Sequence, residues 1–495
     1  MAFTDILIGI AIYAVVALMV VGVAPGSWLS RTSMSRKTRP VVVATCIATV
    51  ALCVLSMELN PTWTEGQLLW TNQYELMADA LLKGQLHLDL PVSRELAEMD
   101  NPYDYRLRKL LDVECYWDHA YYDGRYYMYF GVVPAVLVFA PFKLLFGVSL
   151  PAYHATQLFV ALYVIGQFVL FGSLRRHFFP TMRMSAFLSL TVAFALMSVW
   201  FACAHPALYC TAISSALAAE IWSICCFTRA LIVTKSRARQ LALLALGALL
   251  GALAFGCRPP VALANVIVVP VFVALARRHG PTRALAADTL ALAVPYLVVG
   301  CLLMLYNYAR FDSPFEFGQS YQLTFYDQSD YGARTIDPAT ALDSILLFLF
   351  KPPFARGAFG GVFTNFPIIV VSLLALASDK ARAALRRSGL AWFLTAAVAA
   401  IALISIIEAA WSPAILERYR MDVYWICGLV AFVLFGFWGR RARNKPLFSF
   451  LVSLGAIATA LTAIAFFFVP HDYSITSSMP ELLPRILNCL TFGLA

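Results

Sequence analysis

The sequence predicts an all-α fold, a polytopic membrane protein of about 12 to 13 transmembrane helices that form a single integral membrane domain over residues 1–495. Hydrophobic residues make up 61% of the chain and charged residues only 13%, whereas a soluble domain carries about 25% charged residues. The apolar residues also gather in runs of about 20, the length that a helix needs to cross a bilayer. The composition therefore excludes a large soluble enzyme.

The positive charge of the chain reports its orientation in a membrane. The formal net charge is +9, but most lysines and arginines lie in short blocks between apolar runs, as in residues 31–39 and 440–445. Such blocks are typical of cytoplasmic loops. We therefore expect a multi-pass protein of the plasma membrane, with the lipid bilayer as its surroundings and no nucleic-acid partner.

The apolar runs give the order of the spans. Residues 6–23 lead inward to the first basic block, and residues 41–57 return to the outer face. Residues 131–147, which Pro134 and Pro141 interrupt, either span the membrane or re-enter it. The clearer spans that follow are residues 153–174, 184–202, 207–227, 241–256, 261–276, 285–306, 368–376, 391–407, 423–438 and 447–469.

Two polar segments separate these runs and are expected on the outer face. Residues 58–130 form the predicted extracytoplasmic catalytic loop. Between residues 58 and 126 it holds 13 acidic and six basic residues, out of 28 acidic residues in the whole chain. Residues 307–360 form a second extracytoplasmic loop with interfacial segments. This concentration of acidic residues places the candidate chemistry in the first loop.

Asp118 is the first candidate for a catalytic base. It lies between Trp117 and His119, just before a run of tyrosines that includes Tyr122 and Tyr126. A carboxylate packed among rings loses solvation, which raises its pKa toward the range useful for accepting a proton. The same residues are as typical of an interfacial aromatic belt in which Asp118 caps a turn, and both interpretations stay open.

Glu75 and Glu58 are the next candidates for the base. Glu75 belongs to an amphipathic segment and lies four residues before Asp79, so the two share a helix face. A pair of this kind is more often a solvated face than a catalytic pair. Glu58 directly follows an apolar run, which places it at the level of the lipid headgroups, and Glu65 is a further carboxylate nearby.

Several cations lie at predicted outer ends of spans, against the positive-inside trend. Arg258, in the segment GCRPP, either snorkels to the surface or binds a phosphate with its planar group of donors. Lys351 with Arg356, and Arg418 beside Tyr419, have similar positions. The complete set of substrate-binding candidates is Arg258, Arg418, Tyr419, Lys351, Arg125, His119, Trp117, Tyr122, Tyr126 and His205.

Common catalytic motifs are missing from the sequence. There is no GxxxxGK[ST] loop, no HExxH, no GxSxG and no Cys/His metal spacing. We therefore name no metal ligand and require no cofactor. A divalent cation, Mg²⁺ or Mn²⁺, stays open because acidic residues are plentiful.

Five segments carry a resemblance to a known family: YELMADALLKGQLHLDLP, WDHAYYDGRYYMYFGVVPAVLVFAPFKLLFG, GCRPP, YNYARFDSPFEFGQSYQ and ERYRMD. In this order they resemble the GT-C superfamily of polyprenyl-phosphate-sugar-dependent membrane glycosyltransferases. The bacterial relatives of protein O-mannosyltransferases and aminoarabinose transferases belong to this superfamily. The chain departs from many members at Trp70 and Thr71, where an acidic pair is common, and at His205 and Tyr209, where a further aspartate is common.

The resemblance implies transfer of a hexose or pentose from a polyprenyl-phosphate-linked donor to a cell-envelope glycan, lipid or protein on the outer face. The expected route is one displacement with inversion, in which a carboxylate accepts a proton and arginines stabilise the departing phosphate. A transporter or flippase of a lipid-linked saccharide, and a non-catalytic assembly subunit, are the alternatives. A transporter predicts a polar cavity across the membrane, whereas the enzyme predicts a pocket closed from below.

Overall fold

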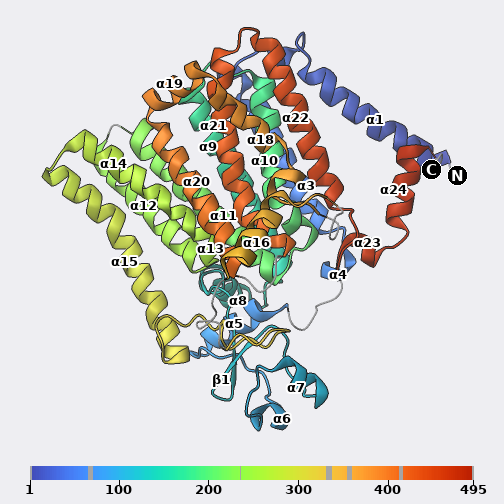
Figure 1. Cartoon of the computed structure of the whole chain (residues 1–495), viewed down its shortest axis with the longest axis vertical. Coiled ribbons are helices and arrows are strands. Elements are labelled where there is room, and N and C mark those ends of the chain that lie inside the picture. The colour runs from blue at the N-terminus through green and yellow to red at the C-terminus, as the bar shows by residue number, and fades with distance from the viewer. Residues whose placement is uncertain are drawn as a thin grey trace.

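The computed structural model describes residues 3–64, 71–234, 236–329, 337–353, 359–411 and 416–492. Nearly all regular structure in these residues is helical, and they contain one two-stranded sheet. Figure 1 shows a bundle of long helices with the first polar loop gathered at one end, which we call the loop end. The predicted all-α fold class is confirmed.

Eleven helical segments in the described residues are long and apolar enough to cross a membrane. Backbone groups inside a helix pair with one another, as a lipid environment requires. The main helices of the eleven segments are α1 (Phe3–Val23), α3 (Arg39–Met57), α9 (Ala152–Phe178), α10 (Met184–Ala204), α11 (Leu208–Thr228), α12 (Arg237–Phe255), α14 (Val268–His279), α15 (Arg283–Phe311), α20 (Leu390–Ile406), α21 (Met421–Arg441) and α22 (Lys445–Phe466).

A shorter passage completes the bundle. α15 ends at the loop end, whereas α19 (Asp379–Ser388), which leads into α20, lies at the opposite end (Figure 1). Between them lie α16 (Pro338–Phe350), α18 (Ile368–Leu373) and the 3₁₀ turn η6 (Leu374–Ala377). α18 packs against α21 and α22. The predicted span at residues 368–376 is therefore a short helix on the side of the bundle, with Val370, Val371, Leu373 and Leu374 exposed.

Residues 131–147 do not cross the bundle. The π-helical turn η2 (Ala135–Phe139) and α8 (Ala140–Phe146) together reach about 18 Å, less than the roughly 30 Å of a hydrocarbon core. Both ends lie at the loop end: Val133 N–H donates to the Gly256 carbonyl over 3.0 Å, and Lys143 pairs with Asp79 of α5 (Gln73–Leu82). The segment thus lies along the bundle end, with residues 144–146 exposed.

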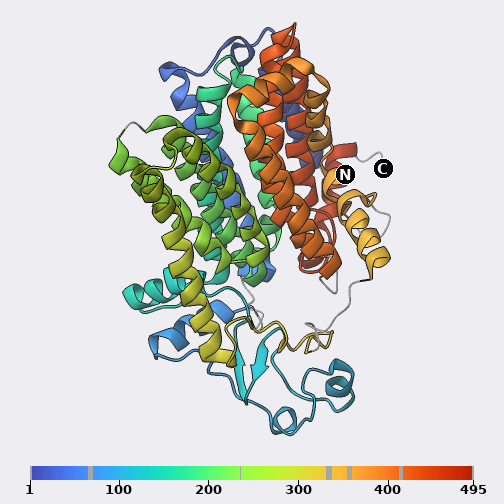
Figure 2. The ribbon, with the colours of Figure 1, turned by 60° about the vertical axis from the view of Figure 1, so that its left-hand side comes forward.

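The first loop folds as short elements below the bundle (Figure 2). They are α4 (Pro61–Thr64), α5, α6 (Arg94–Ala97), α7 (Tyr105–Leu110), β1 (Ala120–Tyr122) and β2 (Arg125–Tyr127). Asp123 and Gly124 join the antiparallel strands with φ of 47° and 69°. Two positive φ angles are what a tight hairpin turn needs, and Asp-Gly supplies them at low cost.

The second loop adds a further segment to this hairpin. Asp118 N–H donates to the Leu323 carbonyl over 3.0 Å, and Leu323 N–H donates to the His119 carbonyl over 2.9 Å. Tyr121 N–H donates to the Tyr321 carbonyl over 2.9 Å. Two loops that are distant in sequence are therefore joined by backbone hydrogen bonds directly beneath the bundle.

The core of the molecule lies where α10 and α21 pack together, because these two helices are the most completely buried of the eleven segments. α1 and α15 lie at the periphery and bury little of their apolar surface. In a bilayer such apolar surface faces lipid. The loops at the loop end therefore lie on closely packed helices.

Candidate functional site

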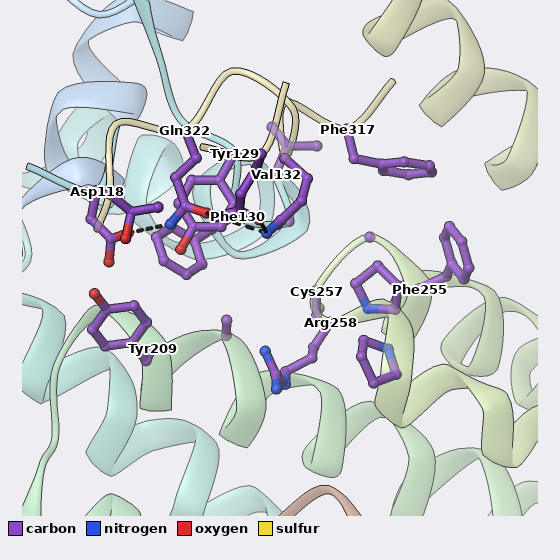
Figure 3. Close-up of a pocket in the computed structure, with 18 of the residues that line it drawn as sticks. Asp118, Tyr129, Phe130, Val132, Tyr209, Phe255, Cys257, Arg258, Phe317 and Gln322 are labelled. Atoms are coloured by element: carbon purple, nitrogen blue, oxygen red, sulfur yellow. Dashed lines mark hydrogen bonds between the residues drawn. The ribbon is translucent and has the colours of Figure 1, made fainter. Parts of the chain in front are cut away.

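A cavity of about 590 Å³ lies at the loop end of the bundle (Figure 3). Both polar loops line it, together with the neighbouring ends of α11, α12 and α15 and the chain around Glu408 and Arg418. Its volume falls within the range of about 300–1,000 Å³ that is usual for small-molecule sites. The cavity can hold a sugar together with a phosphate group.

Asp118 lies in the wall of the cavity at the start of the hairpin. Its φ of 61° is a left-handed conformation that Asp tolerates better than most residues. The side chain is 5% exposed, and its Oδ1 accepts a hydrogen bond from Gln322 Nε2 (Figure 3). Burial raises the pKa of Asp118 to about 6, although Arg418, Gln322 and Tyr129 each lower it. The carboxylate is therefore held in place and is more basic than an exposed aspartate.

Arg258 lies on the opposite side of the cavity. The two prolines that follow it begin α13 (Pro259–Ala262) and favour the extended backbone that Arg258 adopts. Its Nε donates to Asp422 Oδ2 over 2.8 Å, and its Nη2 donates to Glu408 Oε1 over 3.0 Å. Burial alone would lower the pKa of Arg258, but Asp422 and Glu408 hold it above its ordinary value. This guanidinium is therefore fixed by two carboxylates.

Arg418 and Arg310 also line the cavity, and neither forms a salt bridge with a carboxylate that the structure describes. The Arg418 guanidinium carbon lies 3.7 Å from the centre of the Tyr209 ring, and its Nε is buried without a hydrogen-bond partner. Arg310 donates to the Met128 carbonyl over 2.7 Å and to Asn307 Oδ1 over 2.8 Å. Two guanidinium groups without a carboxylate partner give this region the positive character that attracts an anion.

The end of the cavity away from Asp118 is apolar. Phe255 and Phe317 lie there in Figure 3, with ring centroids 5.9 Å apart and with 39% and 38% of their surfaces exposed. Leu303, on the peripheral helix α15, continues this lining. The cavity thus runs from a carboxylate, past cations, to an apolar end beside helices that face lipid.

Five predicted candidates meet in this cavity: Trp117, Asp118, Arg258, Arg418 and Tyr419. The lining residues do not include Glu75, Glu58, Lys351, Arg125, His119, Tyr122, Tyr126 or His205. Glu65, Trp70 and Arg356 lie outside the described residues.

The two other candidate bases accept hydrogen bonds from α9. Glu75 Oε1 accepts a hydrogen bond from the first N–H of α9, at Ala152, over 2.9 Å. Burial raises the pKa of Glu75 to about 7, whereas its backbone hydrogen bonds lower it. Glu58 Oε1 accepts from Gln157 Nε2 over 2.5 Å. Both carboxylates therefore support the place where the first loop meets α9.

The histidines and the remaining aromatic candidates lie behind or beside the cavity. His119 is fully buried against Tyr126, and burial lowers its pKa to about 4. Tyr122 contacts Tyr321, with ring centroids 4.5 Å apart and the ring planes tilted by 35°. His205 stacks on Phe201 at 4.4 Å, and burial lowers its pKa to about 3.

The two remaining cations on the candidate list lie apart from the cavity. Arg125 is exposed on β2. Lys351 Nζ lies 3.9 Å from Glu417 Oε1.

Three charged residues of the site were not among the candidates. Glu408 ends a long apolar run, and a charge in that position is a signal for function. Asp422 and Arg310 lie inside the quoted segments ERYRMD and YNYARFDSPFEFGQSYQ. Asp422 pairs with Arg258, and Arg310 donates to the Met128 carbonyl. Each contact joins segments that are far apart in the chain, so no local sequence pattern shows it.

The described residues offer little to a divalent cation. No group of three or more His, Cys, Asp or Glu side chains gathers among them as a metal site would require. Asp118 and Glu408 are the carboxylates in the described cavity lining, and Glu408 is held by Arg258. A cation would thus have one unpaired carboxylate here, fewer than the several oxygen ligands that Mg²⁺ prefers.

No protein-family model matches the chain, and no curated protein matches it in sequence. Among solved structures it is similar to the apo oligosaccharyltransferase of Archaeoglobus fulgidus, with a TM-score of 0.50 and 12% identity over 87% of this chain and 56% of that chain. The oligosaccharyltransferase AglB of the same organism, solved with an inhibitory peptide and a dolichol-phosphate, gives a TM-score of 0.46 and 12% identity. That match covers 86% of this chain and 56% of that chain, so the chain spans little more than half the length of either. The chain therefore has the fold of a GT-C membrane glycosyltransferase.

Proposed function

We propose that the chain is a membrane glycosyltransferase that takes a hexose or pentose from a polyprenyl-phosphate-linked donor. The acceptor is a cell-envelope glycan, lipid or protein. The fold shared with an oligosaccharyltransferase supports the class of reaction. The narrower resemblance to bacterial relatives of protein O-mannosyltransferases and aminoarabinose transferases stays a prediction.

One observation carries this proposal: a buried carboxylate of raised pKa and three guanidinium groups line a single cavity with an apolar end. The carboxylate of Asp118 suits a proton acceptor near neutral pH. Arg418, Arg310 and Arg258 suit a phosphate, because guanidinium donors match its oxygens in pairs. The apolar end beside Phe255 and Phe317 suits the first units of a lipid tail.

The geometry supports a single displacement. The acceptor hydroxyl oxygen attacks the anomeric carbon of the donor sugar, and its proton passes to the Asp118 carboxylate. The bond between the anomeric carbon and the phosphate oxygen breaks, and the electron pair leaves with the lipid phosphate. Arg418 and Arg310 stabilise the charge that develops there, as fixed donors do in a site that excludes water. The configuration at the anomeric carbon inverts.

The site is proposed to face the outside of the plasma membrane. The basic blocks at residues 31–39 and 440–445 lie at the end of the bundle opposite the loops. Since such blocks stay cytoplasmic, the loop end is extracytoplasmic. The donor then reaches the cavity from the outer leaflet, beside α12 and α15.

The packing beneath the cavity favours an enzyme over a transporter or flippase. α21 is buried from Met421 to Phe437, and α10 is buried along most of its length. Large apolar side chains fill the space between these helices. A polar path between these two helices is therefore closed in the described part of the bundle. A transferase needs an outward pocket above such a packed core.

The substitution Asp118→Asn tests the proposal. It keeps the shape of the side chain and removes the base, so we expect sugar transfer from a polyprenyl-phosphate donor to fall by about 10²- to 10⁴-fold. The matched control is Asp123→Asn, an exposed aspartate in the hairpin turn with a similar positive φ. Full transfer by the double variant Asp118→Asn, Glu75→Gln would refute the assignment of the base.

A further inference from the structure

The wall of the cavity nearest to the first loop carries exposed aromatic rings. Phe325 and Tyr326 both line the cavity and are 61% and 48% exposed. Trp117 lies against Phe325 with ring centroids 4.3 Å apart, and Tyr105 holds the same ring from another side at 5.0 Å. A ring that is fixed by neighbours and still exposed is a preformed surface for a ligand.

Three glutamines continue this wall and end at the proposed base. Gln328 Nε2 donates to Gln322 Oε1 over 2.8 Å, and Gln319 Nε2 donates to the same oxygen over 3.3 Å. Gln322 in turn donates to Asp118, and Gln319 donates to Gln328. Since both hydrogen bonds of Gln319 use its amino group, its carbonyl oxygen accepts none from a described residue and is left for a ligand hydroxyl.

The wall is neutral apart from Asp118. Its other side chains in the described lining are aromatic rings, amides and the hydroxyl of Thr324. Asp327 is the nearest acidic neighbour in sequence, and it is occupied by Asn101 Nδ2 at 2.9 Å and Ser329 Oγ at 2.6 Å. The cations of the cavity belong to other segments, at Arg258, Arg310 and Arg418. A ligand with hydroxyls and no charge fits such a wall better than a phosphorylated or basic one.

We infer that this wall, formed by Trp117, Gln319, Gln322, Phe325 and Gln328, is the acceptor subsite and that the acceptor is a neutral saccharide. The apolar C–H face of a pyranose ring lies on Phe325, and ring hydroxyls exchange hydrogen bonds with the amides. One hydroxyl reaches the Asp118 carboxylate and becomes the attacking oxygen. The inference rests on the proposed function and narrows its acceptor from glycan, lipid or protein to glycan.

The hairpin argues against a peptide acceptor held by strand addition. One edge of the sheet is already taken by residues 321–323, through the hydrogen bond from Tyr121 N–H to the Tyr321 carbonyl. The other edge is taken by Leu88, whose N–H donates to the Tyr126 carbonyl over 2.8 Å. In the described part of the first loop no free strand edge is left for an extended peptide, which needs one for this mode of binding.

The experiment measures binding without turnover. The full-length protein in lipid nanodiscs is mixed with methyl glycosides of glucose, galactose, mannose and N-acetylglucosamine, or with serine- and threonine-containing peptides. Saturation-transfer NMR then detects binding. We expect at least one glycoside to bind, with its C–H protons receiving most saturation. Phe325→Ala should weaken that binding by about tenfold, and Gln319→Ala should weaken it as well.

Phe315→Ala is the matched control, because Phe315 is 73% exposed on the same loop and does not line the cavity. It should bind the glycoside as the wild type does. Two results would overturn the inference: binding of peptides but of no glycoside, or equal glycoside binding by Phe325→Ala and the wild type. Sugar transfer measured in parallel would still uphold the proposed function in either case. Glycoside binding at Phe325 with no transfer from any polyprenyl-phosphate sugar overturns the acceptor role together with the proposed function.

Discussion

Asp118 is the residue whose ionisation decides the proposed reaction. Burial raises its pKa to about 6, and only the ionised form accepts a proton. We expect kcat/KM to level off above about pH 7 and to fall about tenfold for each pH unit well below pH 6. The pH profile of sugar transfer measures this. A profile that is flat from about pH 5 to pH 8 would contradict the assignment.

The same pKa shift has a consequence for stability. The folded state holds the proton of Asp118 more tightly than the unfolded chain does, because the pKa rises from 3.8 to about 6 on folding. The stability that protonation provides is therefore complete below about pH 4 and is lost as the pH rises through 6. The ionised carboxylate costs about 3 kcal/mol at higher pH. Asp118→Asn should thus raise the unfolding temperature at pH 8 and have less effect at pH 5, as thermal unfolding of the detergent-solubilised protein will show.

Arg258 and Asp422 form a buried ion pair whose removal should be costly. Asp422 is fully buried, and Asp422→Ala would leave Arg258 with Glu408 alone. Losing one partner of a buried pair costs about 3–5 kcal/mol, because the other charge stays desolvated. The control is Asp5→Ala, which removes the pair of Asp5 with the largely exposed Arg485 and should cost at most about 1 kcal/mol. Equal unfolding temperatures for the two variants would show that Asp422 is not needed to hold Arg258.

At the scale of elements, the first loop makes its closest backbone contact with the bundle at Gly131. A Cβ added there would overlap the backbone of Gly256 and Cys257, which cannot move as a side chain can. Gly131→Ala should therefore shift the loop away from the α12–α13 turn and reduce sugar transfer strongly. Gly172→Ala in α9 is the control, since a Cβ there meets nothing within 4 Å and Ala favours a helix by about 1 kcal/mol. Sugar transfer at the wild-type rate by Gly131→Ala would show that this close contact is not needed for activity.

The sequence predicts the long elements well and the short ones poorly. A run of about 20 apolar residues crosses lipid as a helix, because only a helix pairs all of its backbone groups within the segment. The eleven long spans therefore follow from hydropathy. The hairpin of β1 and β2 was not predicted, because its alternation is only three residues long on each strand and its stability depends on residues 321–323. Residues 131–147 were ambiguous for the same reason, since their position depends on contacts with α5 and with Gly256.

The sequence also predicts only part of the candidate site. Residue type and position were enough to select Asp118, Arg258 and Arg418, which line one cavity. Glu75 has the same chemistry, but its hydrogen bond to the first N–H of α9 depends on a residue 77 positions away. Glu408 was missed because its role comes from Arg258 on another segment. Sequence alone thus finds side chains able to do the chemistry and cannot show which of them share a cavity.

For the whole molecule, the orientation in the membrane is open to a direct test. The two ends of the described chain lie together at the molecule's edge, where Tyr13 Oη donates to the Leu490 carbonyl over 2.8 Å. Alkaline phosphatase fused after Thr491 should be active, because the C-terminal helix α24 (Leu482–Thr491) is expected outside. The same fusion after Ala442, in the basic loop, should be inactive. The reverse pattern would place the site in the cytoplasm.

The backbone pairing of β1 with residues 321–323 has a consequence for how the protein is made. About 200 residues, including six spans, are synthesised between Ala120 and Gln322. At about 5–20 residues per second the edge of β1 stays open for roughly 10–40 seconds. An open strand edge is a template for wrong pairing, so the nascent loop is exposed to misfolding until α15 has been inserted. The cavity is completed late in translation, and a chain that stops before residue 317 has the hairpin but not the site.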